Sequence, residues 1–181
     1  ATAAELVRQR HRAVLGVMNS GGDYAAFLAR KRLALPPAGI DEIRPLNAAL
    51  FPFQRLATEE LLRRGRGAAF LDTGLGKTLV QLEWARVVAA HTDRAVLILA
   101  PLAVAQQTVR EGAKFGIPVT HCYDAGDVRL GINVTNYHKL HKFDPDVFGG
   151  VVLDESSILK SFDGATRNML CGAFARTPYR L

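Results

Sequence analysis

A short turn at residues 72–78, with the sequence DTGLGKT, contains the residue types that bind phosphate groups. Glycines such as Gly74 and Gly76 adopt positive φ angles, which lets successive backbone N–H groups converge on an anion. In this pattern the lysine contacts the β and γ phosphates and the following hydroxyl binds Mg²⁺. The general pattern GxxxxGK[ST] requires glycine at position 71, where this chain has Leu71. The candidate phosphate-contacting residues are Thr73, Gly74, Leu75, Gly76, Lys77 and Thr78.

An acidic pair, Asp154 and Glu155, directly follows the apolar run Val151–Leu153. An apolar strand that ends in carboxylates places them at the carboxyl edge of a sheet, from which phosphate-binding turns also leave. Asp154 is then a candidate Mg²⁺ ligand, and Glu155 is a candidate base for an attacking water. Alone, such a pair also fits a solvated strand end. Together with the glycine turn it predicts hydrolysis of a nucleoside triphosphate with Mg²⁺, and we assign the catalytic roles to Lys77, Asp154 and Glu155.

These side chains need alternating strands and helices to position them, and the sequence from residue 51 onward has that pattern. Short runs that are apolar throughout predict a parallel sheet covered on both faces, which is a doubly wound α/β fold. We expect strands at 68–71, 95–99, 119–123, 132–135 and 151–153, with another opening at residue 179. We expect helices at about 53–64 (buried face Phe53, Ala57, Leu61), from 77 onward (buried stripe Val80, Trp84, Val87, Val88), at 103–115 and at 166–174.

The first part of the chain, residues 1–49, is predicted to be a separate helical accessory segment that ends in a proline-rich break. The formal net charge of +6 favours polyanionic partners without identifying one, because the basic residues are spread along the chain. No apolar run approaches the roughly 20 residues that a membrane helix needs. The two cysteines, Cys122 and Cys171, lack the spacing of a zinc or redox pair. We therefore expect a cytoplasmic protein without a membrane partner.

Two other pairs contain metal-binding residue types: His121 with Cys122, and His138 with His141. Neither pair has the spacing of a zinc site, so we interpret these side chains as packed or facing solvent.

The motifs and their order resemble superfamily-two helicases, and especially Swi/Snf-like DNA translocases. DTGLGKT followed by LVQ is similar to their motif I, which commonly lacks the outer glycine, and VVLDESSILKS to their motif II. In motif II, Ser156 and Ser157 stand where many relatives have alanine or glycine and then histidine, which puts in doubt how the ATP state is coupled to nucleic-acid contacts. LFPFQ is similar to the upstream glutamine motif, in which the amide of Gln54 would read adenine.

Two other segments resemble the family's nucleic-acid motifs. VLILAPLAVAQQTVRE is similar to motif Ia, and VTNYHKL is similar to motif Ib. The resemblance implies that five residues approach the nucleic-acid backbone: Pro101, Leu102, Thr135, Asn136 and Tyr137. Contacts to the nucleic-acid backbone do not depend on the base sequence, which suits a motor that moves along any DNA.

The resemblance covers residues 50–181 and implies the amino-terminal RecA-like ATP-binding domain, preceded by the helical segment 1–49. GAFARTPYRL is similar to the run before motif III, so motif III and the second RecA-like domain, with its arginines, would lie outside these residues. The implied parent is a DNA-dependent ATPase, a helicase or double-stranded DNA translocase, with RNA left open as the track. Because an arginine finger contributes roughly 10³ to 10⁵ in rate, we expect the lobe alone to hydrolyse ATP slowly.

Two other functions are weighed against the motor. In the first, ATP regulates a nucleic-acid or protein interaction without translocation. In the second, the chain is a kinase that transfers phosphate to a small acceptor. The kinase is disfavoured because an acidic pair at a strand end suits water activation and no acceptor lid is apparent in the sequence.

Overall fold

A computed structural model describes residues 39–72, 74–155 and 164–181. The predicted helices of residues 1–38, together with Thr73, Ser156 and Ser157, lie outside that part of the chain.

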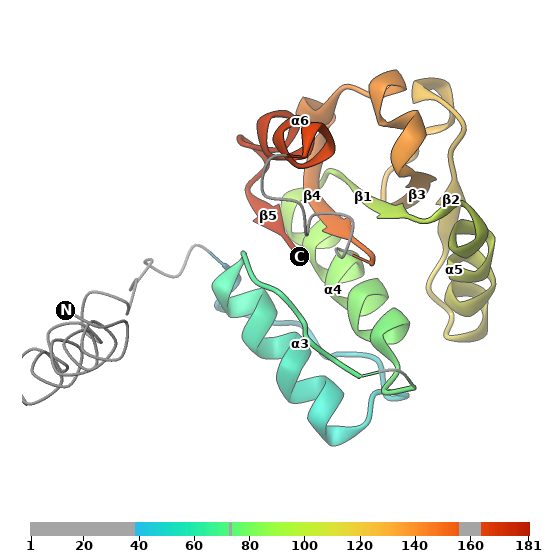
Figure 1. The fold of residues 1–181 in the computed structure, drawn as a ribbon. Helices are drawn as coiled ribbons and strands as arrows, with labels where there is room; N and C mark the ends of the chain where they lie inside the picture. Colours follow the sequence, from blue (N-terminus) through green and yellow to red (C-terminus); the bar gives the residue numbers. More distant parts are fainter. Residues whose placement is uncertain (1–38, 73, 156–163) are drawn as a thin grey trace, which may run out of the picture. The chain divides into compact units, whose positions relative to one another are not determined.

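The core of the fold is a five-stranded sheet in which every strand pair is parallel (Figure 1). The strand order is β2-β3-β1-β4-β5, so the chain crosses from one strand to the next over the faces of the sheet. This arrangement confirms the predicted α/β class. The strands are β1 (Ala95–Ala100), β2 (Val119–His121), β3 (Ile132–Asn136), β4 (Phe148–Leu153) and β5 (Tyr179–Arg180).

Both faces of the sheet are covered, as a doubly wound fold requires. Along β1, Val96 and Ile98 belong to one apolar core, while Leu97 and Leu99 belong to a second core on the other face. The first core contains residues of α3, α4 and α5, and the second contains residues of η2 and α6. The helices are α3 (Pro52–Arg64), α4 (Lys77–Thr92), α5 (Leu102–Lys114) and α6 (Ala165–Ala173), with 3₁₀ turns η1 (Ala125–Asp127), η2 (Tyr137–Lys142) and η3 (Pro145–Val147). None of the described helices combines the length and apolarity needed to cross a membrane.

The helix that follows the glycine turn, α4, is buried on nearly all sides. The predicted stripe of Val80, Trp84, Val87 and Val88 is buried, but so are most other residues of the helix. The reason is that α4 lies between the sheet and α3, so it has no solvent face of the usual width. Similarly, α3 buries Gln54, Thr58, Leu61 and Leu62, whereas the predicted core residue Phe53 is exposed.

A buried carboxylate on α4, that of Glu83, ties the segment before α3 to the core. Arg86 donates to both oxygens of Glu83 at 2.8 and 2.7 Å, and the backbone N–H of Asn47 donates to one of them at 2.8 Å. Ile40, Leu46 and Leu50 pack into the same core as α3 and α4. Residues from 40 onward therefore pack against the predicted nucleotide-binding domain, while the division of the chain near residue 50 stays a prediction.

The prediction of a strand at residues 68–71 is wrong. This segment approaches the sheet beside β5, where a single parallel bridge joins Arg66 to Arg180. The N–H of Gly67 donates to the Arg180 carbonyl, and the N–H of Arg180 donates to the Gly65 carbonyl, each at 3.0 Å. Beyond this bridge the segment is irregular and Phe70 is 93% exposed. A strand needs partners for its backbone groups, and in the described part of the chain the bridge at Arg66 does not continue into residues 68–71.

Candidate active site

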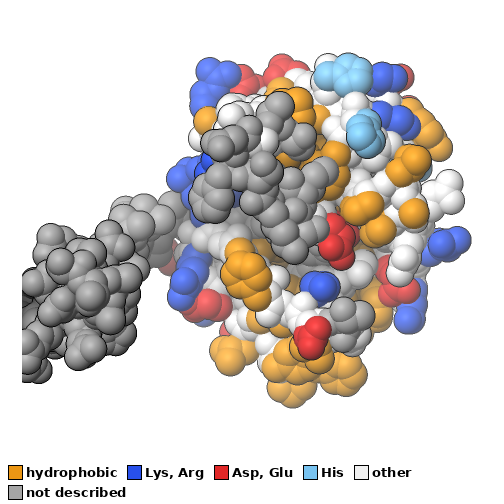
Figure 2. Space-filling model, viewed as in Figure 1, with side chains coloured by type: hydrophobic (Ala, Val, Ile, Leu, Met, Phe, Trp, Pro, Cys, Tyr) orange, Lys and Arg blue, Asp and Glu red, His pale blue; other side chains and the backbone are white. Residues whose placement is uncertain are grey.

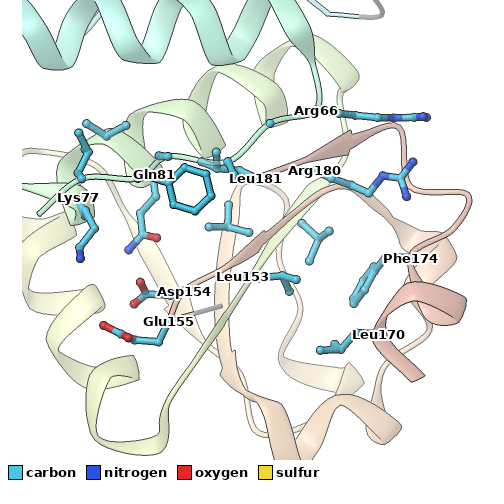
Figure 3. Close-up of a pocket in the computed structure, with 18 of the residues that line it drawn as sticks. Arg66, Lys77, Gln81, Leu153, Asp154, Glu155, Leu170, Phe174, Arg180 and Leu181 are labelled. Atoms are coloured by element: carbon cyan, nitrogen blue, oxygen red, sulfur yellow. The ribbon is translucent and has the colours of Figure 1, made fainter. Parts of the chain in front are cut away.

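The glycine turn and the acidic pair meet at one edge of the sheet. Lys77 begins α4 directly after the turn, and Asp154 directly follows β4. Both line one pocket of about 720 Å³, together with Glu155 and the segment 66–71. Figure 3 shows Lys77 and Gln81 extending from α4 toward Asp154 and Glu155. The structure therefore brings together the three residues that the sequence predicts to be catalytic.

The backbone of the glycine turn has the positive φ angles that its glycines permit. Gly74 has φ 84° and Gly76 has φ 72°, and the N–H of Leu75 bonds to the Asp72 carbonyl at 3.3 Å. Gly74 and Leu75 are exposed, and Thr78 is half-buried in the first turn of α4. Because the turn leads into a helix amino terminus, it lies at the end of α4 where the helix dipole favours an anion.

Gln54 is nine-tenths buried and contacts the glycine turn through its side chain. Its Nε2 donates to the Leu75 carbonyl at 2.8 Å, and its Oε1 accepts from the Phe51 N–H at 2.9 Å. A Cβ at Gly76 would lie 2.4 Å from Nε2. The φ angle of Gly76 favours glycine, and a Cβ at this position would also force the Gln54 amide to shift. The contact between Gln54 and adenine that the resemblance implies stays a prediction.

The carboxylate of Asp154 is partly buried in an environment that disfavours its charge. Burial raises its pKa above the usual range, and the neighbouring Glu155 adds to this rise, while a hydrogen bond from the Gln81 side chain and the positive charge of Lys77 oppose it. A carboxylate in this state gains stability from an added cation. Gln81 was not singled out in the sequence, although its spacing of four residues from Lys77 places both on one face of α4.

The backbone of Asp154 is held on both sides, by Leu99 of β1 and by Tyr137, the first residue of η2. Its N–H donates to the Leu99 carbonyl at 2.9 Å, and its carbonyl accepts from the Tyr137 hydroxyl at 2.6 Å. The Tyr137 side chain is 7% exposed, and burial raises the pKa of its hydroxyl above the usual value. This bond joins the predicted motif Ib segment to the predicted motif II segment, a relationship that spacing in the sequence does not reveal.

The residues predicted to contact nucleic acid differ in exposure. Leu102 is 71% exposed and Pro101 is half-buried at the end of β1. Thr135 and Asn136 are buried, and the Thr135 hydroxyl donates to the Cys122 carbonyl at 2.9 Å. Contact of these residues, and of Tyr137, with a nucleic acid stays a prediction.

The two pairs weighed as metal ligands, His121 with Cys122 and His138 with His141, form no metal site in the part of the chain that the structure describes. There, no three His, Cys, Asp or Glu side chains are grouped to hold an ion. His121 packs against the Tyr123 ring, and His141 Nδ1 lies 2.9 Å from the His138 carbonyl.

The donor groups of the site fit a nucleoside triphosphate with Mg²⁺. Mg²⁺ is usually bound by one or two protein oxygens together with substrate phosphates. The Thr78 hydroxyl and the Asp154 carboxylate are of this kind, and the ammonium group of Lys77 lines the same pocket as Asp154. Exposed apolar side chains gather beside the turn, where α3 begins (Figure 2); they include Phe51 and Phe53, whose rings stack at 6.3 Å, and Leu75.

Comparison with known proteins gives matches among solved structures. No family model and no curated protein matches the chain. The fold is similar to that of the UvsW helicase from bacteriophage T4, with TM-score 0.61 and 18% identity over 89% of this chain and 58% of that chain. A second T4 UvsW structure matches with TM-score 0.61 and 18% identity over 89% of this chain and 33% of that one.

A third match is the Sulfolobus solfataricus SWI2/SNF2 ATPase core in complex with dsDNA. Its TM-score is 0.56, with 20% identity over 77% of this chain and 32% of that chain. The chain thus spans 58% of the first UvsW structure and about a third of each of the other two. At this level of identity the comparisons establish the fold: the chain has a RecA-like α/β fold, similar to that of the UvsW helicase and to that of the SWI2/SNF2 ATPase core.

Proposed function

We propose that this chain is the ATP-binding lobe of a DNA-dependent ATPase that moves along double-stranded DNA. The observation that carries the proposal is the meeting of Lys77, which directly follows the glycines of the turn, with Asp154 and Glu155 in one pocket at the carboxyl edge of a parallel sheet. The similarity in fold to a helicase and to an ATPase core crystallised with dsDNA supports the choice of reaction and track.

Each residue of the site has a role in this proposal. The N–H groups of Gly74, Gly76 and Lys77, together with the Lys77 ammonium, would bind the phosphates, while Thr78 and Asp154 would hold Mg²⁺. Gln81 orients the Asp154 carboxylate through its hydrogen bond. Glu155 orients the attacking water and accepts its proton. Bound Mg²⁺ neutralises charge that develops on the phosphates.

We place the adenine base of ATP at the exposed apolar surface beside Gln54. Phe51 and Phe53 offer aromatic rings there, and Gln54 already holds the glycine turn through Leu75. A second RecA-like lobe of the full-length protein would cover this side and supply arginines to the γ-phosphate, as the resemblance implies.

The test is ATP hydrolysis by the full-length protein with and without double-stranded DNA. We expect DNA to increase the rate, Lys77→Ala to abolish nucleotide binding, and Glu155→Gln to retain binding but lose hydrolysis. Lys114→Ala is the matched control, because Lys114 is exposed on α5 and pairs with Glu111. Equal hydrolysis with and without DNA would contradict the motor, and binding that survives Lys77→Ala would contradict the assigned phosphate site.

A second candidate function is an ATP-regulated binding module that does not translocate. It is favoured by the burial of Thr135, Asn136 and Tyr137, three of the five residues assigned to the track. Displacement of the third strand from a DNA triplex separates the two functions. A motor displaces that strand when ATP is present, whereas a binding module leaves it in place.

A further inference from the structure

Glu155 has a left-handed backbone, with φ 56°, although it is not a glycine. Among the described non-glycine residues, positive φ occurs at one other position, Asp93, with φ 50°. Asp93 ends α4, where a left-handed residue is common. Glu155 instead follows a strand, so the surrounding structure must hold it in this conformation.

The peptide group that joins Asp154 to Glu155 is held by the Tyr137 hydroxyl. That hydroxyl donates to the Asp154 carbonyl at 2.6 Å. The carbonyl is part of the Asp154–Glu155 peptide group, and the orientation of this group sets the direction in which the Glu155 backbone continues. On the other side of Asp154, the N–H is fixed by Leu99 at 2.9 Å. The two bonds fix the backbone on both sides of Asp154, and the Tyr137 bond is the one adjacent to Glu155.

Tyr137 is itself rigidly placed. Its side chain is 7% exposed and packs in the apolar core that contains Leu140, Phe143 and Val151. A buried hydroxyl with a short hydrogen bond keeps its acceptor, because leaving either group without a partner costs free energy. The hydroxyl therefore fixes the peptide before Glu155 relative to the end of β3, which Tyr137 directly follows.

We propose that Tyr137 is a positioning residue for hydrolysis, which holds the Asp154–Glu155 peptide so that the Glu155 carboxylate faces the attacking water. This inference rests on the proposed function, because it assigns Glu155 to the water. Tyr137 acts through Glu155 and touches neither the nucleotide nor the water. Its hydroxyl is a donor of a fixed hydrogen bond and exchanges no proton with the substrate.

The test compares Tyr137→Phe with Tyr179→Phe in the full-length protein. Tyr179 is equally buried and lies in the neighbouring strand β5, where its ring contacts His91. Loss of one buried hydrogen bond to a catalytic segment predicts a fall of about tenfold in kcat for Tyr137→Phe. The KM for ATP is expected to stay close to that of the unchanged protein, and the thermal midpoint to fall by about 2 to 8 °C, because one partly buried hydrogen bond is lost. Tyr179→Phe should leave kcat within about twofold.

A double-substitution cycle tests whether Tyr137 acts through Glu155. Adding Tyr137→Phe to Glu155→Gln should lower the residual rate by less than about twofold, because the positioned group is already gone. A further tenfold fall in that background would overturn the proposal. So would an unchanged kcat in Tyr137→Phe alone, or an equal loss in Tyr179→Phe. A Tyr137→Phe protein that fails to fold, or that changes KM while kcat is unaffected, assigns Tyr137 a structural role and overturns it as well.

Failure of the proposed function is recognised separately. In that case the unchanged protein shows no ATP hydrolysis with any nucleic acid, and both inferences fall together. Hydrolysis that is normal in the unchanged protein and in Tyr137→Phe overturns the positioning role alone.

Discussion

The side-chain amide of Gln54 donates to the backbone carbonyl of Leu75 at 2.8 Å, across 21 residues of sequence. This bond joins the first turn of α3 to the middle of the glycine turn. The other polar atom of the Gln54 amide, Oε1, accepts a hydrogen bond from the Phe51 N–H. Gln54 therefore holds both the start of α3 and the glycine turn. A residue that the family resemblance assigns to adenine thus has a second partner in the protein itself.

Replacing Gln54 with alanine is expected to weaken nucleotide binding. The substitution removes two partly buried hydrogen bonds, and we expect the dissociation constant for ATP to rise by about tenfold. Titration with a fluorescent ATP analogue measures it. Gln106→Ala is the control, since Gln106 is exposed on α5. Affinity that is unchanged in Gln54→Ala would show that the glycine turn keeps its shape without this contact.

Gly76→Ala is expected to destabilise the protein and to impair nucleotide binding. Alanine is strained at φ 72°, and its Cβ would lie 2.4 Å from Gln54 Nε2. We expect a loss of about 1 to 2 kcal/mol in the free energy of unfolding, measured by urea denaturation.

Gly172→Ala is the matched control for this glycine. Gly172 lies within α6, and a Cβ there would meet no heavy atom within 4 Å. Alanine is favoured over glycine inside a helix, so the free energy of unfolding should rise by about 0.5 to 1 kcal/mol. If both substitutions changed stability in the same direction, the conformational argument for Gly76 would be wrong.

Arg86→Ala is expected to destabilise the protein strongly, because it leaves the carboxylate of Glu83 buried without its charged partner. The Glu83 side chain is fully buried and would keep the Asn47 N–H as a donor. Since Arg86 itself is partly exposed, we expect a loss of about 2 to 3 kcal/mol, near the lower end for a broken buried pair. The exposed Arg64–Glu60 pair on α3 provides the comparison, and Arg64→Ala should cost at most about 1 kcal/mol. Similar losses from the two substitutions would contradict this ranking.

The two cysteines should differ in reactivity. Burial raises the pKa of the Cys122 thiol to about 11, whereas Cys171 is exposed on α6. Because the thiolate is the reactive form, Cys122 should stay protonated and slow to react at about pH 8. With a chromogenic disulfide reagent, we expect one thiol per chain to react rapidly and the second to react on unfolding. Cys171→Ser should remove the rapid reaction, and a rapid reaction that remains in this variant would contradict the burial of Cys122.

Local patterns in the sequence were sufficient to locate most elements of the fold. Runs such as Ala95–Leu99 are apolar throughout because both faces of a parallel strand are buried, and the structure places β1 there. The glycine turn was equally recognisable, because its chemistry depends on neighbouring residues. The segment 68–71 shows the limit of this reasoning. Its composition predicts a strand, but a strand forms only where backbone partners lie beside it, and the described pairing with β5 is a single bridge at Arg66.

The sequence by itself predicted which residues would bind phosphate and Mg²⁺, and it determined that an α/β sheet would carry them. The tertiary structure decided which distant side chains support them: Gln54 on the Leu75 carbonyl, Gln81 on Asp154, and the Tyr137 hydroxyl on the Asp154 carbonyl. It also decided that Thr135 and Asn136 are buried. Periodicity assigns a residue to a face of its own helix or strand. Which partner meets that face depends on the order of the strands and the packing of helices across them, and these are set by the whole fold.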